Sequence, residues 1–124
     1  MPFFHFALRQ HNYPYQETVV WLRDTHREDT ILFTGLDYRY YLNFYFEKLN
    51  WHPDYYVIFV DQNKGFHLAF SESLAEVQEM DINVIVYHIL DEELKPPNEI
   101  NSYFLEKTFK NQTHTILVYT KTQP

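Results

Sequence analysis

The chain contains no cysteine, which excludes disulfides, thiolate nucleophiles and cysteine-ligated zinc. It has only two glycines, Gly35 and Gly65, in 124 residues. A dinucleotide-binding turn needs three closely spaced glycines and a P-loop needs two before its lysine, so neither fingerprint is present. We therefore expect no nucleotide cofactor.

Basic residues are also scarce, since ten Lys and Arg stand against 17 Asp and Glu and give a net charge of −7. Binding to a phosphate backbone needs clustered Lys and Arg, so nucleic acid is not an expected partner. No apolar run approaches the ~20 residues that cross a bilayer. The chain as given thus carries no predicted transmembrane segment, although it can be part of a longer protein.

Aromatic and apolar side chains are abundant, at 19% and 45% of the residues. Continuous apolar runs without alternation are typical of strands buried on both faces, and strands separated by helical stretches favour a parallel sheet. The chain therefore predicts a single α/β domain over residues 1–124. Its expected architecture is a three-layer α/β/α sandwich with a small, mainly parallel sheet of four to five strands, Rossmann-like but without the nucleotide fingerprint. The predicted strands are residues 30–34, 55–60, 83–87 and 115–119, and the predicted helices are residues 14–26, 38–49, 73–80 and 98–107.

Polar residues follow the predicted strands, where open α/β sheets bind ligands. A buried pair of carboxylates at such a position can share a proton or hold a metal ion. The alternative is structural, with Asp37 capping a helix and the other acids simply leaving their strands. The expected ligand-binding residues are Thr34, Asp37, Arg39, Asp61 and Asp91.

A tyrosine-rich stretch, residues 37–46, is the most distinctive local feature and places aromatic residues on every face of its predicted helix. One interpretation is a surface for a carbohydrate, a partner protein or a membrane interface, formed by Tyr38, Tyr41 and Tyr45. The alternative is a helix packed on two sides. The seven histidines are scattered and form no recognised ligand pair, so we predict no metal site and assign His88 to the packing.

The order of elements over residues 10–60 resembles the soluble segment of integral-membrane glycosyltransferases of the dolichyl-phosphate-mannose/aminoarabinose-transferase type. The resemblance lies in an early helix at residues 13–22, Asp29 before a strand, and the tyrosine-rich helix. It implies a non-catalytic domain on the extracytoplasmic face, docked on a membrane bundle of the same polypeptide and helping to position an acceptor or a lipid-linked sugar donor. Residues 1–12 would then be a linker, and the catalytic acids would lie in the membrane bundle, so no residue here is predicted to be catalytic.

Two other classes of function remain open. An acidic, aromatic-rich domain suits a stand-alone inhibitor or immunity-type protein that masks a basic partner, in which case a cytoplasmic location is expected. A small enzyme with its site at the carboxyl ends of the strands is the third class.

Overall fold

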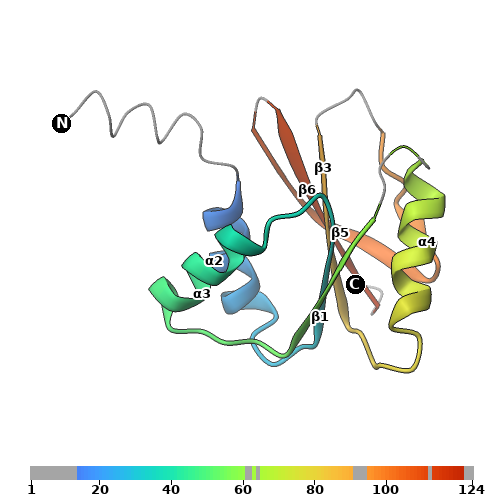
Figure 1. The fold of residues 1–124 in the computed structure, drawn as a ribbon. Coiled ribbons are helices and arrows are strands. Elements are labelled where there is room, and N and C mark those ends of the chain that lie inside the picture. Colours follow the sequence, from blue (N-terminus) through green and yellow to red (C-terminus); the bar gives the residue numbers. More distant parts are fainter. Residues whose placement is uncertain (1–13, 61–62, 64, 91–94, 112, 122–124) are drawn as a thin grey trace.

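The computed structural model describes residues 14–60, 63, 65–90, 95–111 and 113–121. Within these residues, helices cover both faces of one mixed sheet (Figure 1). None of the helices in this part of the chain is long and apolar enough to cross a membrane. The helices are α2 (Tyr15–Thr25), α3 (Arg39–Leu49) and α4 (Phe66–Glu76), and the strands are β1 (Ile31–Gly35), β2 (Tyr55–Phe59), β3 (Val84–Leu90), β4 (Glu99–Ile100), β5 (Tyr103–Lys110) and β6 (His114–Thr120).

The six strands are ordered β2-β1-β3-β6-β5-β4. β1 pairs in parallel with both β2 and β3, whereas β6 pairs antiparallel with β3 and β5, and β4 pairs antiparallel with β5. The sheet curls into a half-barrel, with α2 and α3 against one face and α4 against the other (Figure 1). The strands β2, β1 and β3 thus form a parallel part of the sheet. The strands β6, β5 and β4 continue it from β3 as an antiparallel part.

The predicted fold class is therefore wrong in its sheet: the domain is not a mainly parallel, Rossmann-like sandwich of four to five strands. The error arises at residues 98–107, where apolar spacing and a capping Asn98 predicted a fourth helix. The chain forms β4 and most of β5 there, and Asn101 and Ser102 make the turn between them with positive φ angles of 50° and 69°.

The short connection between β5 and β6 explains why these two strands are antiparallel. Only residues 111–113 connect β5 to β6. A parallel connection needs a crossover of about a dozen residues or more, whereas antiparallel neighbours can be joined by a tight hairpin. Once residues 103–110 form a strand, the next strand must therefore return beside it.

The first two predicted helices are confirmed as α2 and α3. Pro14 stands immediately before α2, where its missing N–H is not needed. The third prediction is wrong in position, because α4 begins at Phe66 and ends at Glu76 rather than opening at Ser73. Ser73 is buried, and its hydroxyl donates to the Phe70 carbonyl instead of capping a helix.

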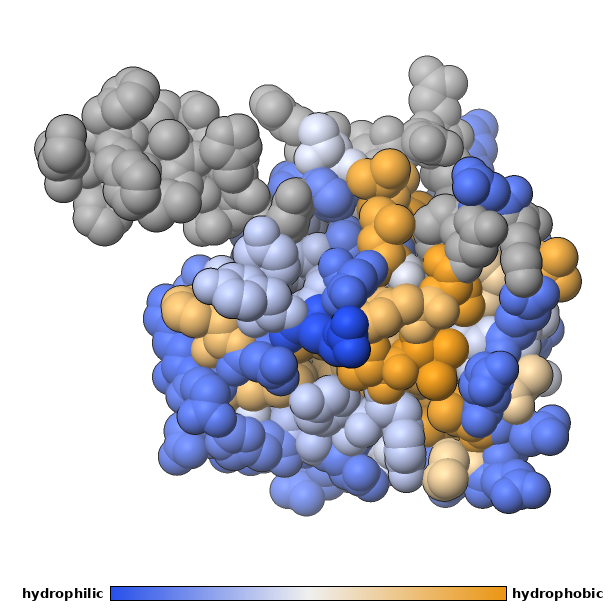
Figure 2. Space-filling model, viewed as in Figure 1, coloured by the Kyte–Doolittle hydropathy of each residue, from blue (hydrophilic) through white to orange (hydrophobic). Residues whose placement is uncertain are grey.

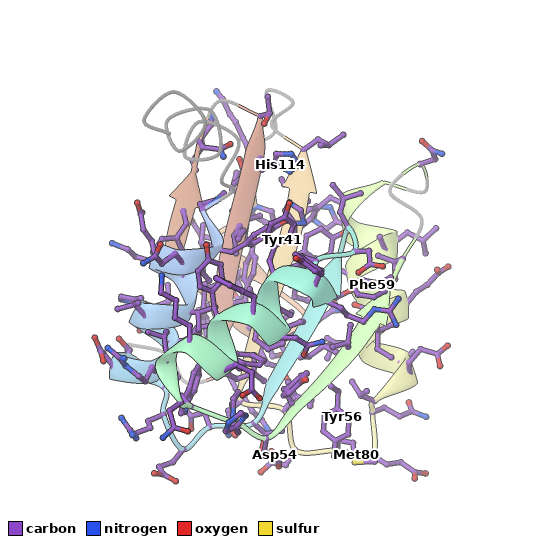
Figure 3. The ribbon with its side chains drawn as sticks, turned by 60° about the vertical axis from the view of Figure 1, so that its left-hand side comes forward. Tyr41, Asp54, Tyr56, Phe59, Met80 and His114 are labelled. Carbon is purple, nitrogen blue, oxygen red and sulfur yellow. The ribbon has the colours of Figure 1, made fainter. Side chains whose placement is uncertain are left out.

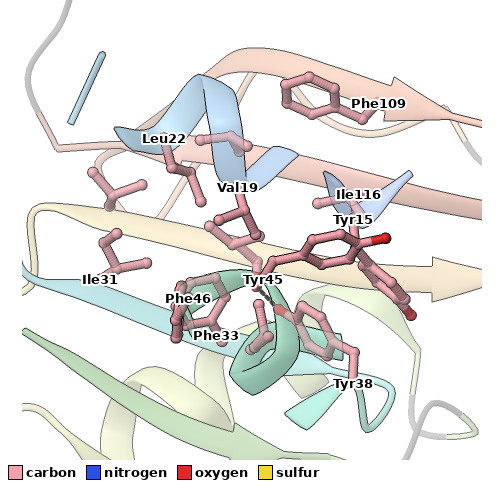
Figure 4. Close-up of a cluster of buried hydrophobic side chains, with 14 of the residues drawn as sticks. Tyr15, Val19, Leu22, Ile31, Phe33, Tyr38, Tyr45, Phe46, Phe109 and Ile116 are labelled. Atoms are coloured by element: carbon pink, nitrogen blue, oxygen red, sulfur yellow. Dashed lines mark hydrogen bonds between the residues drawn. The ribbon is translucent and has the colours of Figure 1, made fainter. Parts of the chain in front are cut away.

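Two hydrophobic clusters hold the layers together. Alternation along each strand divides the side chains, so that Phe33 faces α2 and α3 while Leu32 faces α4. Figure 4 shows the first cluster, in which Val19 and Leu22 of α2 pack near Phe46 of α3 over the sheet. In the second cluster, the Phe70 ring contacts the rings of both Tyr87 and Tyr119.

Candidate functional site

The outward face of α3 carries the most exposed aromatic side chains of the described residues. Tyr40 is 78% exposed and Phe44 is 53% exposed. They stand four residues apart, which places them side by side on one face of the helix. The helix presents them because Leu42, Tyr45 and Phe46 already fill its inward face. Two large rings are therefore held in solvent by a helix whose other side is fixed in the core.

A shallow groove of about 590 Å³ runs along these rings and is lined by Tyr40, Asn43, Phe44, Glu47 and Lys48. The Lys48 ammonium lies 5.9 Å from the centre of the Phe44 ring. Asn43 offers an amide donor and acceptor, Glu47 a carboxylate acceptor and Lys48 an ammonium donor. The groove thus combines an aromatic floor with charged and neutral hydrogen-bonding groups.

A pair of opposite charges marks the beginning of α3. The Arg39 guanidinium lies 4.9 Å from the centre of the Phe59 ring and 3.2 Å from the Asp37 carboxylate. Hydrogen bonds from the Arg39 backbone N–H and then from its guanidinium lower the pKa of Asp37. The Asp37 carboxylate thus accepts a hydrogen bond from the first residue of the helix. The cap position itself is occupied by Tyr38, so the alternative in which Asp37 is the capping residue is wrong.

A second cluster of functional groups lies at the carboxyl ends of β1 and β3. Nε2 of His88 is 2.8 Å from Nδ1 of His114, and the Tyr15 hydroxyl is 3.1 Å from the His88 ring nitrogens. The Tyr38 ring lies 5.0 Å from the His88 ring, and Tyr41 packs against Tyr15. Of these residues, Tyr41 and His114 are labelled in Figure 3. The two imidazoles are thus held among tyrosine rings.

Burial governs the charge state of this cluster. Desolvation, followed by the neighbouring His114, lowers the pKa of His88 from 6.5 to about 4, against an opposing hydrogen bond to the Leu36 carbonyl. Burial also lowers the pKa of His114. Both rings are neutral at pH 7 and can share hydrogen bonds with each other and with Tyr15. In the described residues, no group of three His, Asp or Glu side chains is placed to hold a metal ion.

The sequence did not predict that His88 and His114 would meet. They are 26 residues apart, and only the antiparallel register of β3 with β6 brings them together. His114 pairs with Leu90, two residues from His88, so both imidazoles lie on the same face of the sheet. The assignment of His88 to the packing is confirmed, because it is 2% exposed.

Of the residues expected at the strand ends, the structure describes Thr34, Asp37 and Arg39. The structure brings Asp37 and Arg39 together at the surface. Thr34 is fully buried on the α4 side of β1, away from that pair. Asp61 and Asp91 lie outside the described residues, so the expected convergence of acids stays a prediction.

Of the three tyrosines expected on a partner surface, two are buried and one is half-buried. Tyr38 is 1% exposed and donates its hydroxyl to the Val86 carbonyl at 2.6 Å, and Tyr45 is 6% exposed. Tyr41 is half-buried against Tyr15. In the part of the chain that the structure describes, the exposed Phe and Tyr side chains are those of Tyr40 and Phe44, which the sequence did not predict. If Leu42 is taken as an inward residue, helical spacing places Tyr40 and Phe44 on the outward side of the helix.

This chain matches no protein-family model, no curated protein and no solved structure. The resemblance to glycosyltransferases over residues 10–60 therefore stays a prediction.

Proposed function

We propose that this chain is the non-catalytic, extracytoplasmic domain of a membrane-bound glycosyltransferase, and that it positions a sugar acceptor or a lipid-linked sugar donor. The observation that carries the proposal is the exposed aromatic groove on α3. Carbohydrate rings have apolar C–H faces that pack on aromatic rings, and hydroxyl edges that need hydrogen-bond partners. The resemblance over residues 10–60 supports the assignment to a glycosyltransferase.

Each group along the groove has a role in this proposal. Tyr40 and Phe44 form the platform for the sugar ring, since both rings stand in solvent. Asn43 and Glu47 line the groove beside them and accept hydrogen bonds from sugar hydroxyls. The Lys48 ammonium pairs with the phosphate of a lipid-linked donor.

A stand-alone binding protein is the second proposal, and the same surface favours it. Exposed aromatic rings are common anchors of protein interfaces, and a net charge of −7 would steer a basic partner toward the domain. In that case Tyr40 and Phe44 would contact a protein rather than a sugar.

The size and location of the natural protein separate the two proposals. Membrane and non-membrane extracts would be blotted with an antibody raised against this domain. The glycosyltransferase proposal expects a band far above 15.2 kDa in the membrane extract. A band at about 15.2 kDa outside the membrane extract would contradict it and leave the binding protein.

The groove itself is tested by NMR titration of the 124-residue chain with free hexoses and hexose 1-phosphates. We expect shifts confined to α3, and Tyr40→Ala should weaken binding about tenfold or more. Leu68→Ala is the matched control, because Leu68 is a 52% exposed apolar residue on α4, on the other side of the sheet. Equal losses in the two variants, or shifts away from α3, would contradict a sugar site in the groove.

A further inference from the structure

As far as the described residues extend, β2 is an edge strand of the sheet that lacks the usual protection. Within the described residues it pairs only with β1, so its outer N–H and C=O groups face away from the sheet. Natural edge strands are protected by Lys, Pro, a bulge or shortness. The opposite edge, β4, has two residues and an exposed Glu99, whereas residues 55–60 contain neither a charged residue nor Pro or Gly.

The side chains of β2 are incompletely covered on both faces of the sheet. All five are half-buried, whereas all five residues of β1 are buried. The Phe59 ring lies on the α3 side beneath Arg39, and the Tyr56 hydroxyl donates to the Met80 sulfur on the other side (Figure 3). Figure 2 shows hydrophobic side chains gathered on the face where β2 lies, with hydrophilic residues around them. An added strand would cover apolar surface on both faces.

β2 is self-complementary under a two-fold axis. Two copies of one strand related by such an axis run antiparallel. If the axis passes at Val57, Tyr55 of one copy pairs with Phe59 of the other, and Tyr56 pairs with Ile58. Aromatic pairs and pairs of an aromatic with a β-branched residue are favourable across antiparallel strands.

The charges on α3 have the same symmetry. Arg39, Asn43 and Glu47 are spaced four residues apart and form one stripe. The stripe lies toward β2, since Arg39 stacks on Phe59 and Asn43 accepts a hydrogen bond from the Tyr55 hydroxyl. Antiparallel pairing would bring the Arg39 end of one copy to the Glu47 end of the other. The side chains of Arg39 and Glu47 are 63% and 80% exposed. Arg39 contacts the exposed Asp37 carboxylate and the Phe59 ring, and Glu47 lies 4.0 Å from the exposed His52 ring.

From this edge and this stripe we propose that the chain forms a symmetric dimer in which the β2 strands of two copies pair antiparallel and join their sheets. Arg39 of each copy then lies near Glu47 of the other. The rings of Tyr40 and Phe44 belong to the neighbouring stripe of α3 and flank the seam. The dimer contacts come from the strand edge and the charge stripe, and Asn43 and Glu47 of this stripe also line the groove proposed for the sugar. The oligomeric state is therefore measured without sugar, so that the dimer and the sugar site are tested separately.

A charge swap on the 124-residue chain tests the dimer, with its dissociation constant measured by sedimentation equilibrium. We expect a concentration-dependent dimer for the unmodified chain. Arg39→Glu and Glu47→Arg should each weaken it about tenfold, because each places like charges at the seam. The double variant restores opposite charges and should return to the original dissociation constant. In the dimer, amide exchange of residues 55–59 should also slow as protein concentration rises.

Two control variants distinguish the effect of a charge at the dimer seam from the effect of the total charge of the chain. Lys95→Glu changes the total charge as Arg39→Glu does, and Glu79→Arg changes it as Glu47→Arg does, and both sites are exposed. These controls should leave the dimer unchanged. A chain that stays monomeric up to about 1 mM, or a double variant as weak as the single ones, would overturn the proposal.

Discussion

The backbone of Gly35 lies directly against the backbone of His88. The two residues are paired across β1 and β3, and a Cβ built on Gly35 would lie only 2.1 Å from the His88 carbonyl oxygen. Gly35 also has a φ of +96°, a conformation that other residues rarely adopt. β1 ends at this close contact.

Gly35→Ala should therefore lower the free energy of unfolding by about 3 kcal/mol or more, because backbone rather than a flexible side chain must move. Urea unfolding followed by circular dichroism measures the change. Gly65→Ala is the matched control, since Gly65 has a similar φ of +91° but no atom of the described residues lies within 4 Å of the added Cβ. Gly65→Ala should lower the free energy of unfolding by only about 1 kcal/mol, which is the cost of holding alanine at a positive φ. Equal losses would show that the contact with His88 is not what requires glycine.

The lowered pKa of His88 predicts a loss of stability in mild acid. The folded ring resists protonation until about pH 4, whereas an unfolded histidine takes up a proton near pH 6.5. The contribution of the neutral His88 ring to the free energy of unfolding is thus complete above pH 6.5 and decreases as the pH falls toward 4. Between pH 6.5 and pH 5 the free energy of unfolding should drop by about 2 kcal/mol. His114, whose pKa is also lowered, changes it in the same direction.

Urea unfolding at several pH values tests this dependence. His88→Gln removes the titrating group, so its free energy of unfolding should vary less between pH 5 and pH 6.5, whatever its absolute stability. His67→Gln is the control, because His67 is exposed at the start of α4. A wild-type slope retained in His88→Gln would assign the pH dependence to other groups.

Neighbouring tyrosines on α3 predict opposite results for the same substitution. Tyr38→Phe removes a buried hydroxyl that donates to the Val86 carbonyl at 2.6 Å, so it should lower the free energy of unfolding by about 1 kcal/mol. Tyr40→Phe changes a residue that is 78% exposed and should stay within about 0.5 kcal/mol of the unmodified chain. Equal effects would contradict the inward placement of Tyr38.

The sequence predicted the three parallel strands and the helices α2 and α3, but not the bounds of α4, because only the former have clear local signals. The apolar runs that became β1, β2 and β3 stand between polar turns, and the helices α2 and α3 carry inward residues at helical spacing. Residues 98–107 carry a conflicting signal, since Ile100, Tyr103 and Phe104 fit helical spacing. These residues form strands because β5 pairs with β6 across the short connection at residues 111–113. This pairing is not visible in the local sequence pattern.

The candidate site was less predictable because it depends on helix phase and strand register. Tyr38 and Tyr40 have the same chemistry, and only their positions around α3 make one buried and the other exposed. His88 and His114 meet only through the register of β3 with β6. A sequence shows which residue types are available, but such contacts follow from packing between elements distant in the chain.

Thr34 provides a last prediction, since its hydroxyl is fully buried and has no hydrogen-bond partner among the described residues. Thr34→Val replaces this unpaired group with a methyl group of similar size and should raise the free energy of unfolding by about 1 kcal/mol. Thr18→Val is the contrasting variant, because the Thr18 hydroxyl donates to the Pro14 carbonyl at 2.6 Å. That change should destabilise the protein by about 1 kcal/mol. If Thr34→Val is destabilising as well, the Thr34 hydroxyl must bind a polar group in solution, and a water molecule or ligand at the end of β1 would be the group to look for.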